Sequence, residues 1–311
     1  MDTLIAFILF TIGLIIIIKG GDIFLDGAIG LAKKTGISSA IIGATIVSIA
    51  TTLPEMFVSS IASFEGLYDM SVGNALGSYI CNIGFIIGIS TLIKPVDIKF
   101  NFNVKGIMMI GILVMFLLFS IDGVIQKFEG LILMSFVFIF IFIYLREIKR
   151  EEQKNNSVKS SNTITFNYIT MFIFGGILII TGSHILIDSG VKIANVLNIP
   201  TRIISLTLIA LGTSMPELIT ALASIFKKDQ SVSIGNILGA NILNISMILG
   251  TSSLISSEGL IISKQSILVD IPTALILASI FVFSGIYKKK ISRITGLLLL
   301  SIYFIYINIL L

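Results

Sequence analysis

Two glutamates stand inside apolar stretches of this chain at matching positions. Residues 41–56 and 203–218 align without a gap at an offset of 162 residues, which pairs Glu55 with Glu217. A carboxylate near the middle of a bilayer costs roughly 2.5–3.5 kcal/mol on insertion scales, so a repeated pair calls for a functional explanation. We predict that the two carboxylates bind a cation.

A proline and a threonine accompany each glutamate. Pro54 and Pro216 directly precede the acids. A proline inside a helix removes one backbone donor and displaces the carbonyl four residues earlier, so we expect both helices to break beside the charge. Carbonyls released in this way become available as oxygen ligands. Thr51 and Thr213 lie one turn before the glutamates and share a helical face with them.

A second repeated element follows each glutamate, at residues 71–82 and 233–244. Each copy has two glycines in G-x-x-x-G spacing, at Gly73 and Gly77, and at Gly235 and Gly239. Close helix packing alone would explain such a motif. The same close approach would also bring four side-chain amides towards the broken helices: Asn74, Asn82, Asn236 and Asn244.

All these candidate ligands are oxygen atoms, which suit hard cations such as Ca²⁺ or Na⁺. Cys81 is the single cysteine and His184 the single histidine. That composition excludes an intrachain disulfide and a zinc site built from several Cys and His ligands. Two carboxylates balance one Ca²⁺, and competition from sodium ions or protons for the same acids gives a route to exchange.

The elements that position these residues are membrane helices. The chain is 55% hydrophobic and 12% charged, with a mean hydropathy of +1.06, whereas soluble domains are about 25% charged. The net charge of +4 comes from basic residues between apolar spans, where membrane orientation explains them better than nucleic acid. The composition therefore predicts an all-α polytopic membrane protein in contact with the lipid bilayer and with no nucleic-acid partner.

Spans of about 20 apolar residues predict ten transmembrane helices. Their approximate ranges are 3–31, 38–64, 70–93, 104–121, 128–147, 166–194, 200–226, 230–256, 266–286 and 292–310. Five belong to a first repeat at residues 1–147 and five to a second at residues 166–311, with a polar linker at 148–165. Asp270, at the start of the ninth span, is expected to lie at the membrane interface.

Most of the 21 basic residues fall in the loops on one side of these spans. The positive-inside rule then puts both termini outside the cell membrane and the central linker in the cytoplasm. Because the repeat offset crosses five spans, the second copy must cross the membrane in the opposite direction to the first. Two inverted five-helix repeats would bring Glu55 close to Glu217 near the midplane.

Residues 51–55 with 73–78, and 212–217 with 235–240, resemble the two alpha repeats of the calcium/cation antiporter superfamily. Over essentially the whole chain the resemblance is greatest to the prokaryotic sodium/calcium exchangers, whose fold is ten helices in two inverted halves. It implies a secondary antiporter rather than an enzyme, with Ca²⁺ and Na⁺ as transported ions, no cofactor and no obligate protein partner. The first and sixth helices of such exchangers slide past a fixed core to expose the site to each side.

The same resemblance implies the ligands. Calcium would be held by the carboxylates of Glu55 and Glu217 and the backbone carbonyls of Thr51 and Thr213. Sodium would share the glutamates and add a further set of residues: Ser48, Thr52, Ser78, Asn82, Ala210, Ser214 and Asn244. Ser48 and Ala210 would contribute mainly their carbonyls.

This sequence departs from the family pattern at several positions. Ala240 stands opposite Ser78, where a second hydroxyl is common, and Asn244 replaces an aspartate of potassium-dependent relatives. Proton-coupled relatives carry a glutamate shortly after the Gly-Asn of each repeat, which this chain lacks. These differences favour sodium over potassium or protons.

Three alternatives remain. A Ca²⁺/H⁺ antiporter, or one for another divalent cation, would use the same acids. A cation channel is less favoured, because two inverted copies with proline-broken helices suit alternating access. An intramembrane enzyme with Glu55 and Glu217 as an acid/base pair would lack a nucleophile.

Overall fold

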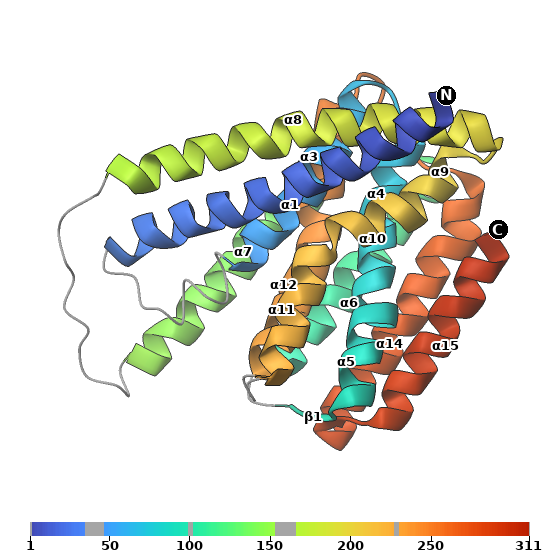
Figure 1. Ribbon diagram of the computed structural model, residues 1–311. Coiled ribbons are helices and arrows are strands. Elements are labelled where there is room, and N and C mark those ends of the chain that lie inside the picture. Colours follow the sequence, from blue (N-terminus) through green and yellow to red (C-terminus); the bar gives the residue numbers. More distant parts are fainter. Residues whose placement is uncertain (1, 35–46, 99–101, 153–165, 227–229, 311) are drawn as a thin grey trace.

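The computed structural model describes residues 2–34, 47–98, 102–152, 166–226 and 230–310, and these residues form a bundle of helices (Figure 1). The helical elements before residue 153 are α1 (Asp2–Lys34), α3 (Val47–Phe64), α4 (Tyr68–Cys81), η2 (Asn82–Ile87), α5 (Gly88–Ile93), α6 (Phe102–Phe119) and α7 (Lys127–Glu152). Those after residue 165 are α8 (Phe166–Leu197), α9 (Thr201–Ile204), η3 (Ser205–Ile209), α10 (Ala210–Thr213), α11 (Met215–Phe226), α12 (Gln230–Leu243), η4 (Asn244–Leu249), α13 (Gly250–Ile255), η5 (Ser266–Asp270), α14 (Ile271–Lys288) and α15 (Arg293–Leu310). Elements marked η are π-helical turns.

Eight helices in the described residues are long and apolar enough to cross a membrane. The two predicted spans not among them are 38–64 and 200–226, which carry the glutamates. Only Val47–Phe64 of the first is described, and it contains Ser, Thr, Pro and Glu. The second is interrupted at Ser214, so its longest apolar helix is Thr201–Thr213. The chain is thus a helical, multi-pass membrane protein, and the count of ten spans stays a prediction.

Two continuous helical rods form the centre of the bundle. The apolar span Tyr68–Ile93 (α4, η2 and α5) is 78% buried, and Ser233–Ile255 (α12, η4 and α13) is 83% buried. The corresponding value for Leu4–Phe24 of α1 is 28%. Residues that face lipid count as exposed, so the high buried share shows that other helices surround the two central rods. Polar side chains on these rods therefore need not face lipid.

Helices α1 and α8 run side by side along the outside of the bundle (Figure 1). Their backbones approach closely at glycines: a Cβ on Gly20 would lie 3.0 Å from the Ile179 nitrogen, and one on Gly182 would lie 3.0 Å from the Gly13 carbonyl oxygen. Both helices also contact α3. Small residues permit this approach, as is usual between membrane helices.

Two short antiparallel strand pairs join loops that are distant in sequence. β1 (Val96–Asp97) pairs with β4 (Lys290–Ile291), and β2 (Val124–Ile125) pairs with β3 (Leu260–Ile261). Each pair connects the part of the chain before residue 147 with the part after residue 166. The loops at the ends of the bundle therefore tie the two parts together.

The two prolines beside the glutamates behave differently. The break predicted at Pro54 is wrong, because α3 continues through it from Val47 to Phe64. The break near Pro216 is confirmed: α10 ends at Thr213, Ser214 leaves helical geometry with φ −81° and ψ 7°, and α11 begins at Met215. Pro216 thus lies in the first turn of α11, where a backbone donor is not needed. One proline inside a helix removes a single hydrogen bond and need not end it.

Candidate cation site

Glu55 of α3 lies beside the α10–α11 break that leads to Glu217, although 161 residues separate the two acids in the chain. Both side chains are buried, at 1% exposure. Ser214 at the α10–α11 break donates a hydrogen bond from Oγ to Glu55 Oε1 at 3.3 Å, and the two carboxylates are close enough to repel each other. The structure therefore brings together the two acids that the repeat singled out.

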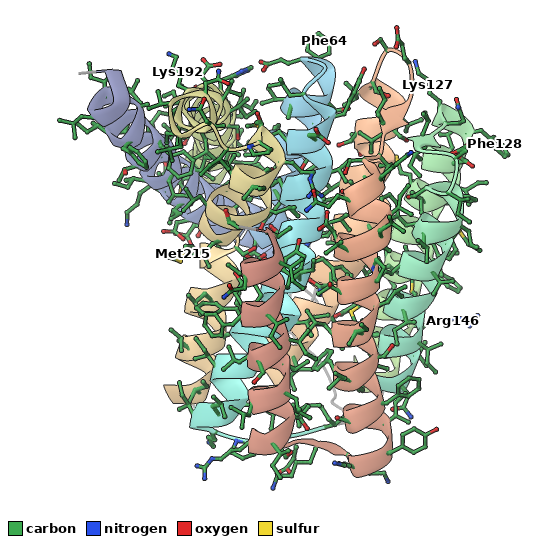
Figure 2. The ribbon with its side chains drawn as sticks, turned by 90° about the vertical axis from the view of Figure 1, so that its right-hand side faces the viewer. Phe64, Lys127, Phe128, Arg146, Lys192 and Met215 are labelled. Carbon is green, nitrogen blue, oxygen red and sulfur yellow. The ribbon has the colours of Figure 1, made fainter. Side chains whose placement is uncertain are left out.

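The site lies well inside the bundle. Figure 2 shows Met215, two residues before Glu217, about half-way along it, whereas Phe64 and Lys127 lie at one end. This depth agrees with the burial of both carboxylates. A charged group at such a depth is stable only when it is neutralised by protons, counter-charges or a bound cation.

Two hydrogen bonds related by the 162-residue offset join the threonines to the asparagines. Thr51 Oγ1 donates to Asn236 Oδ1 at 3.4 Å, and Thr213 Oγ1 donates to Asn74 Oδ1 at 3.2 Å. Adding 162 to 51 gives 213, and adding 162 to 74 gives 236. Each contact therefore joins the threonine of one repeat to the asparagine of the other. The first bond holds α3 against α12, and the second holds α10 against α4.

Asn74 has an additional positioning role. Its Nδ2 donates to the Glu55 carbonyl oxygen at 3.2 Å and to Ser59 Oγ at 2.9 Å. Because Thr213 already occupies its oxygen, the Asn74 amide is engaged at both ends. Asn74 thus joins α3, α4 and α10, and the ligand role expected from the sequence stays a prediction.

Some of the predicted sodium ligands contact one another or the residues next to the acids. Ser78 Oγ is 3.4 Å from both the Ala210 carbonyl oxygen and Thr213 Oγ1. Thr52 Oγ1 donates to the Ser48 carbonyl at 2.7 Å. Ala240, the counterpart of Ser78, offers no hydroxyl, so the site is chemically asymmetric.

Several buried polar atoms here have no hydrogen-bond partner among the described residues. They are Glu55 Oε2, both Glu217 oxygens, Asn82 Oδ1, Asn236 Nδ2 and both Asn244 side-chain atoms. An unsatisfied buried polar atom costs about 1–3 kcal/mol. Because several unpaired oxygens lie in this region, we expect a bound ion to be their partner. Oxygen donors fit Ca²⁺ or Na⁺. Among the described residues, no group of three or more His, Cys, Asp or Glu side chains is arranged to hold a metal ion. Two carboxylates are therefore the acidic ligands that this site offers.

π-helical turns begin at the two matching asparagines. η2 starts at Asn82 and η4 at Asn244, directly after α4 and α12. Such turns shift the backbone hydrogen-bond register by one residue and occur frequently at functional sites. They set the positions from which both asparagines project.

The glycine motifs produce the close packing that their spacing indicates. A Cβ on Gly77 would lie 2.7 Å from the Ala210 Cβ and 2.8 Å from the Leu206 carbonyl oxygen. A Cβ on Gly239 would lie 2.7 Å from Ser48 Oγ. Gly235 has no neighbour this close among the described residues. Gly77 thus allows α4 to lie directly against the segment that leads to Glu217.

We expect Gly77→Ala to force α4 away from η3 and α10. Overpacking of this kind costs about 1–3 kcal/mol, and both the thermal unfolding midpoint and the transport rate should fall. Gly111→Ala in α6 is the matched control, because a Cβ there meets nothing within 4 Å. Equal stability of the two variants in purified form would contradict this packing.

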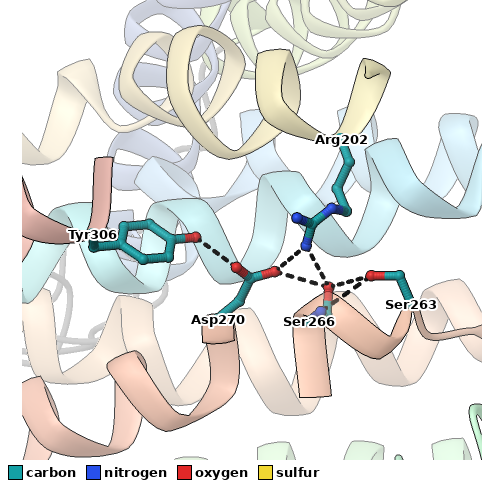
Figure 3. Close-up of polar contacts among 5 residues, drawn as sticks. All are labelled: Arg202, Ser263, Ser266, Asp270 and Tyr306. Atoms are coloured by element: carbon teal, nitrogen blue, oxygen red, sulfur yellow. Dashed lines mark hydrogen bonds and ion pairs between the residues drawn. The ribbon is translucent and has the colours of Figure 1, made fainter. Parts of the chain in front are cut away.

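A second buried polar cluster joins α9 to the last helices (Figure 3). Arg202 Nη1 donates to Asp270 Oδ2 at 2.6 Å and to Ser266 Oγ at 3.3 Å. Tyr306 Oη donates to Asp270 Oδ1 at 3.0 Å. Asp270 is fully buried, and its carboxylate is neutralised there by Arg202. Its position at the depth of the membrane interface stays a prediction.

Comparison with known proteins identifies the family. The model for the sodium/calcium exchanger protein family matches residues 5–146 and 167–311. An uncharacterized membrane protein of Methanocaldococcus jannaschii is 32% identical over 297 residues, covering 95% of each chain. Sodium/calcium exchanger MaX1 of Methanosarcina acetivorans is 26% identical over 345 residues, covering 98% of each.

A solved structure agrees along the whole fold. The sodium-calcium exchanger NCX_Mj, soaked with Na⁺ and Sr²⁺, superposes with a TM-score of 0.71 at 29% identity, covering 98% of this chain and 99% of that one. Both glutamates and the elements around them lie inside the matched ranges. The chain belongs to the sodium/calcium exchanger protein family.

Proposed function

We propose that this protein is a secondary antiporter that exchanges Na⁺ for Ca²⁺ across the cell membrane, and that it catalyses no chemical reaction. The observation that carries the proposal is the pair of buried carboxylates, Glu55 and Glu217, of whose four oxygens three have no hydrogen-bond partner among the described residues. One Ca²⁺ balances their charge. Sodium ions that occupy the same oxygens would displace it, and this competition couples the two fluxes.

The exchange would proceed by alternating access in a fold of ten helices. The proposed arrangement has two inverted repeats, residues 1–147 and 166–311, with a cytoplasmic linker at 148–165 and both termini outside. The reciprocal Thr51–Asn236 and Thr213–Asn74 contacts support it, because a two-fold relation exchanges such pairs. The strand pairs β1–β4 and β2–β3 support it as well, because each pair joins a strand of one proposed repeat to a strand of the other.

Helix α1 is placed to act as the moving cover. Leu14 packs against Gly212, where an added Cβ would lie 2.6 Å from Leu14 Cδ1, and Gly21 lies beside Pro54. Helix α1 therefore contacts both α3, which carries Glu55, and α10, which leads to Glu217. Sliding of α1 together with α8 would uncover the site without separating the central rods.

The proposed ligands are those implied by the family. Calcium would take the carboxylates of Glu55 and Glu217 and the Thr51 and Thr213 carbonyls. Sodium would share the acids and use Ser48, Thr52, Ser78, Asn82, Ala210, Ser214 and Asn244. The unpaired Asn82 and Asn244 oxygens support this set, as do the printed names of MaX1 and NCX_Mj, which are sodium/calcium exchangers.

The driving ion is tested in vesicles. Liposomes containing the purified protein and loaded with Na⁺ should take up labelled Ca²⁺ when diluted into sodium-free medium, because outward sodium movement drives calcium inward. Liposomes without sodium but with an outward proton gradient serve as the comparison. Equal uptake under the proton gradient would contradict sodium coupling and indicate Ca²⁺/H⁺ exchange. Single-channel current steps would contradict the antiporter and indicate a channel.

A further inference from the structure

Asn241 lies inside the second copy of the repeated element, residues 233–244, but it is not one of the residues that match between the two copies. Its side chain is fully buried in α12, and the residue 162 positions earlier is Tyr79. No amide exists at this place in the first half. Asn241 is thus a polar residue particular to one side of the site.

Both ends of its amide are used. Asn241 Nδ2 donates to the Tyr79 carbonyl oxygen at 3.2 Å, and Asn241 Oδ1 accepts from Asn82 Nδ2 at 2.9 Å. A backbone carbonyl can only accept a hydrogen bond. The NH₂ group of Asn241 must therefore face Tyr79, and its oxygen must face Asn82.

The same logic fixes the next amide in the chain of hydrogen bonds. An oxygen at Asn241 Oδ1 requires a donor opposite, so Asn82 must present its NH₂ group there. The Asn82 oxygen is then directed away from Asn241, and it has no hydrogen-bond partner among the described residues. Asn82 stands where α4 passes into the π-helical turn η2.

We propose that Asn241 is a positioning residue for cation binding: it holds the Asn82 amide with its oxygen, rather than its NH₂ group, directed at a bound Na⁺. Without this contact the Asn82 amide can rotate by half a turn, and the positive end of its dipole then faces the ion. The inference rests on the proposed sodium site and deepens it.

The test is a double-variant cycle in reconstituted liposomes. Asn241→Leu keeps the size of the side chain and removes both hydrogen bonds. We expect it to raise the half-saturating Na⁺ concentration about fivefold, the equivalent of one neutral hydrogen bond. Asn82→Leu should raise it at least as much, and the double variant should match Asn82→Leu alone because Asn241 acts through Asn82.

Calcium–calcium exchange in sodium-free medium separates positioning from general damage. The proposed calcium ligands do not include Asn82, so the half-saturating Ca²⁺ concentration of Asn241→Leu should stay within about twofold of wild type. Ser246→Ala is the matched control: Ser246 is buried in the adjacent η4 turn and donates to the Ile242 carbonyl one helical turn earlier, not to Asn82 or Asn241 among the described residues. Its sodium dependence should be that of wild type.

The outcomes are distinct. Wild-type sodium dependence in Asn241→Leu, equal losses for sodium and calcium, or additive effects in the double variant would each overturn the positioning role while sodium-driven exchange stands. Wild-type liposomes with no sodium-driven calcium uptake would overturn the proposed function and this inference together.

Discussion

Glu217→Gln is expected to abolish sodium-driven calcium uptake, and Glu55→Gln should do the same. Glutamine has nearly the same shape as glutamate, so the packing around α11 is retained while one negative charge is lost. With Ca²⁺ bound, the lost carboxylate leaves one positive charge of the buried cation without a partner, which costs about 3–5 kcal/mol and corresponds to roughly a 10²–10⁴-fold loss of affinity. The remaining single carboxylate cannot balance a divalent cation.

The measurement for these variants is labelled Ca²⁺ uptake in sodium-loaded liposomes, together with calcium binding to the purified protein. Glu258→Gln is the control, because Glu258 is an exposed acid in the loop after α13. It should transport like wild type. Uptake by Glu55→Gln or Glu217→Gln at more than about a tenth of the wild-type rate would contradict the role given to that acid.

Asp270→Leu is expected to destabilise the protein by about 3–5 kcal/mol, because it leaves the Arg202 guanidinium buried without a counter-charge. The side chains of Arg202 and Asp270 are 5% and 0% exposed. Ser266 alone would remain as a partner for Arg202 Nη1. The expected result is a large drop in the thermal unfolding midpoint of the purified protein.

Removing both charges should reverse most of this loss. The double variant Arg202→Met with Asp270→Leu replaces the ion pair by apolar side chains, which is often neutral or favourable. Asp97→Asn is the control: its partner Lys290 is 3.8 Å away, both side chains are more than half exposed, and such pairs contribute little. A double variant no more stable than Asp270→Leu would show that the pair itself is not what stabilises this contact.

The pairing of Glu55 with Glu217 could be predicted because the sequence repeats. A gapless offset carries geometric information, since matched residues of a two-fold arrangement meet near its axis. The reciprocal contacts of Thr51 with Asn236 and Thr213 with Asn74 follow from the same relation. Residues that repeat were therefore the ones whose positions the sequence could predict.

Residues without a counterpart could not be placed in this way. Asn241 corresponds to a tyrosine, so comparison of the halves gave no reason to select it. An available signal was its chemistry: an amide within the otherwise apolar end of α12, three residues before Asn244. Such a residue needs a partner when buried, and only the fold shows that the partner is Asn82.

The ion pair of Asp270 could not be predicted for a related reason. A charge at the end of an apolar span is solvated at the interface unless an opposite charge lies nearby. Arg202 is 68 residues away in sequence, and only the fold shows that the two side chains meet. Likewise, the different effects of Pro54 and Pro216 depend on Ser214, where the backbone turns before α11 begins.

The most direct test of the two-carboxylate site is the position of a bound divalent cation. Crystals of this protein soaked with Sr²⁺, a stand-in for Ca²⁺ with a strong anomalous signal, should show a peak between the Glu55 and Glu217 carboxylates that disappears when Na⁺ is raised. The peak should also be absent from Glu217→Gln. A Sr²⁺ peak elsewhere in the bundle, or one between the glutamates that sodium does not displace, would contradict the account.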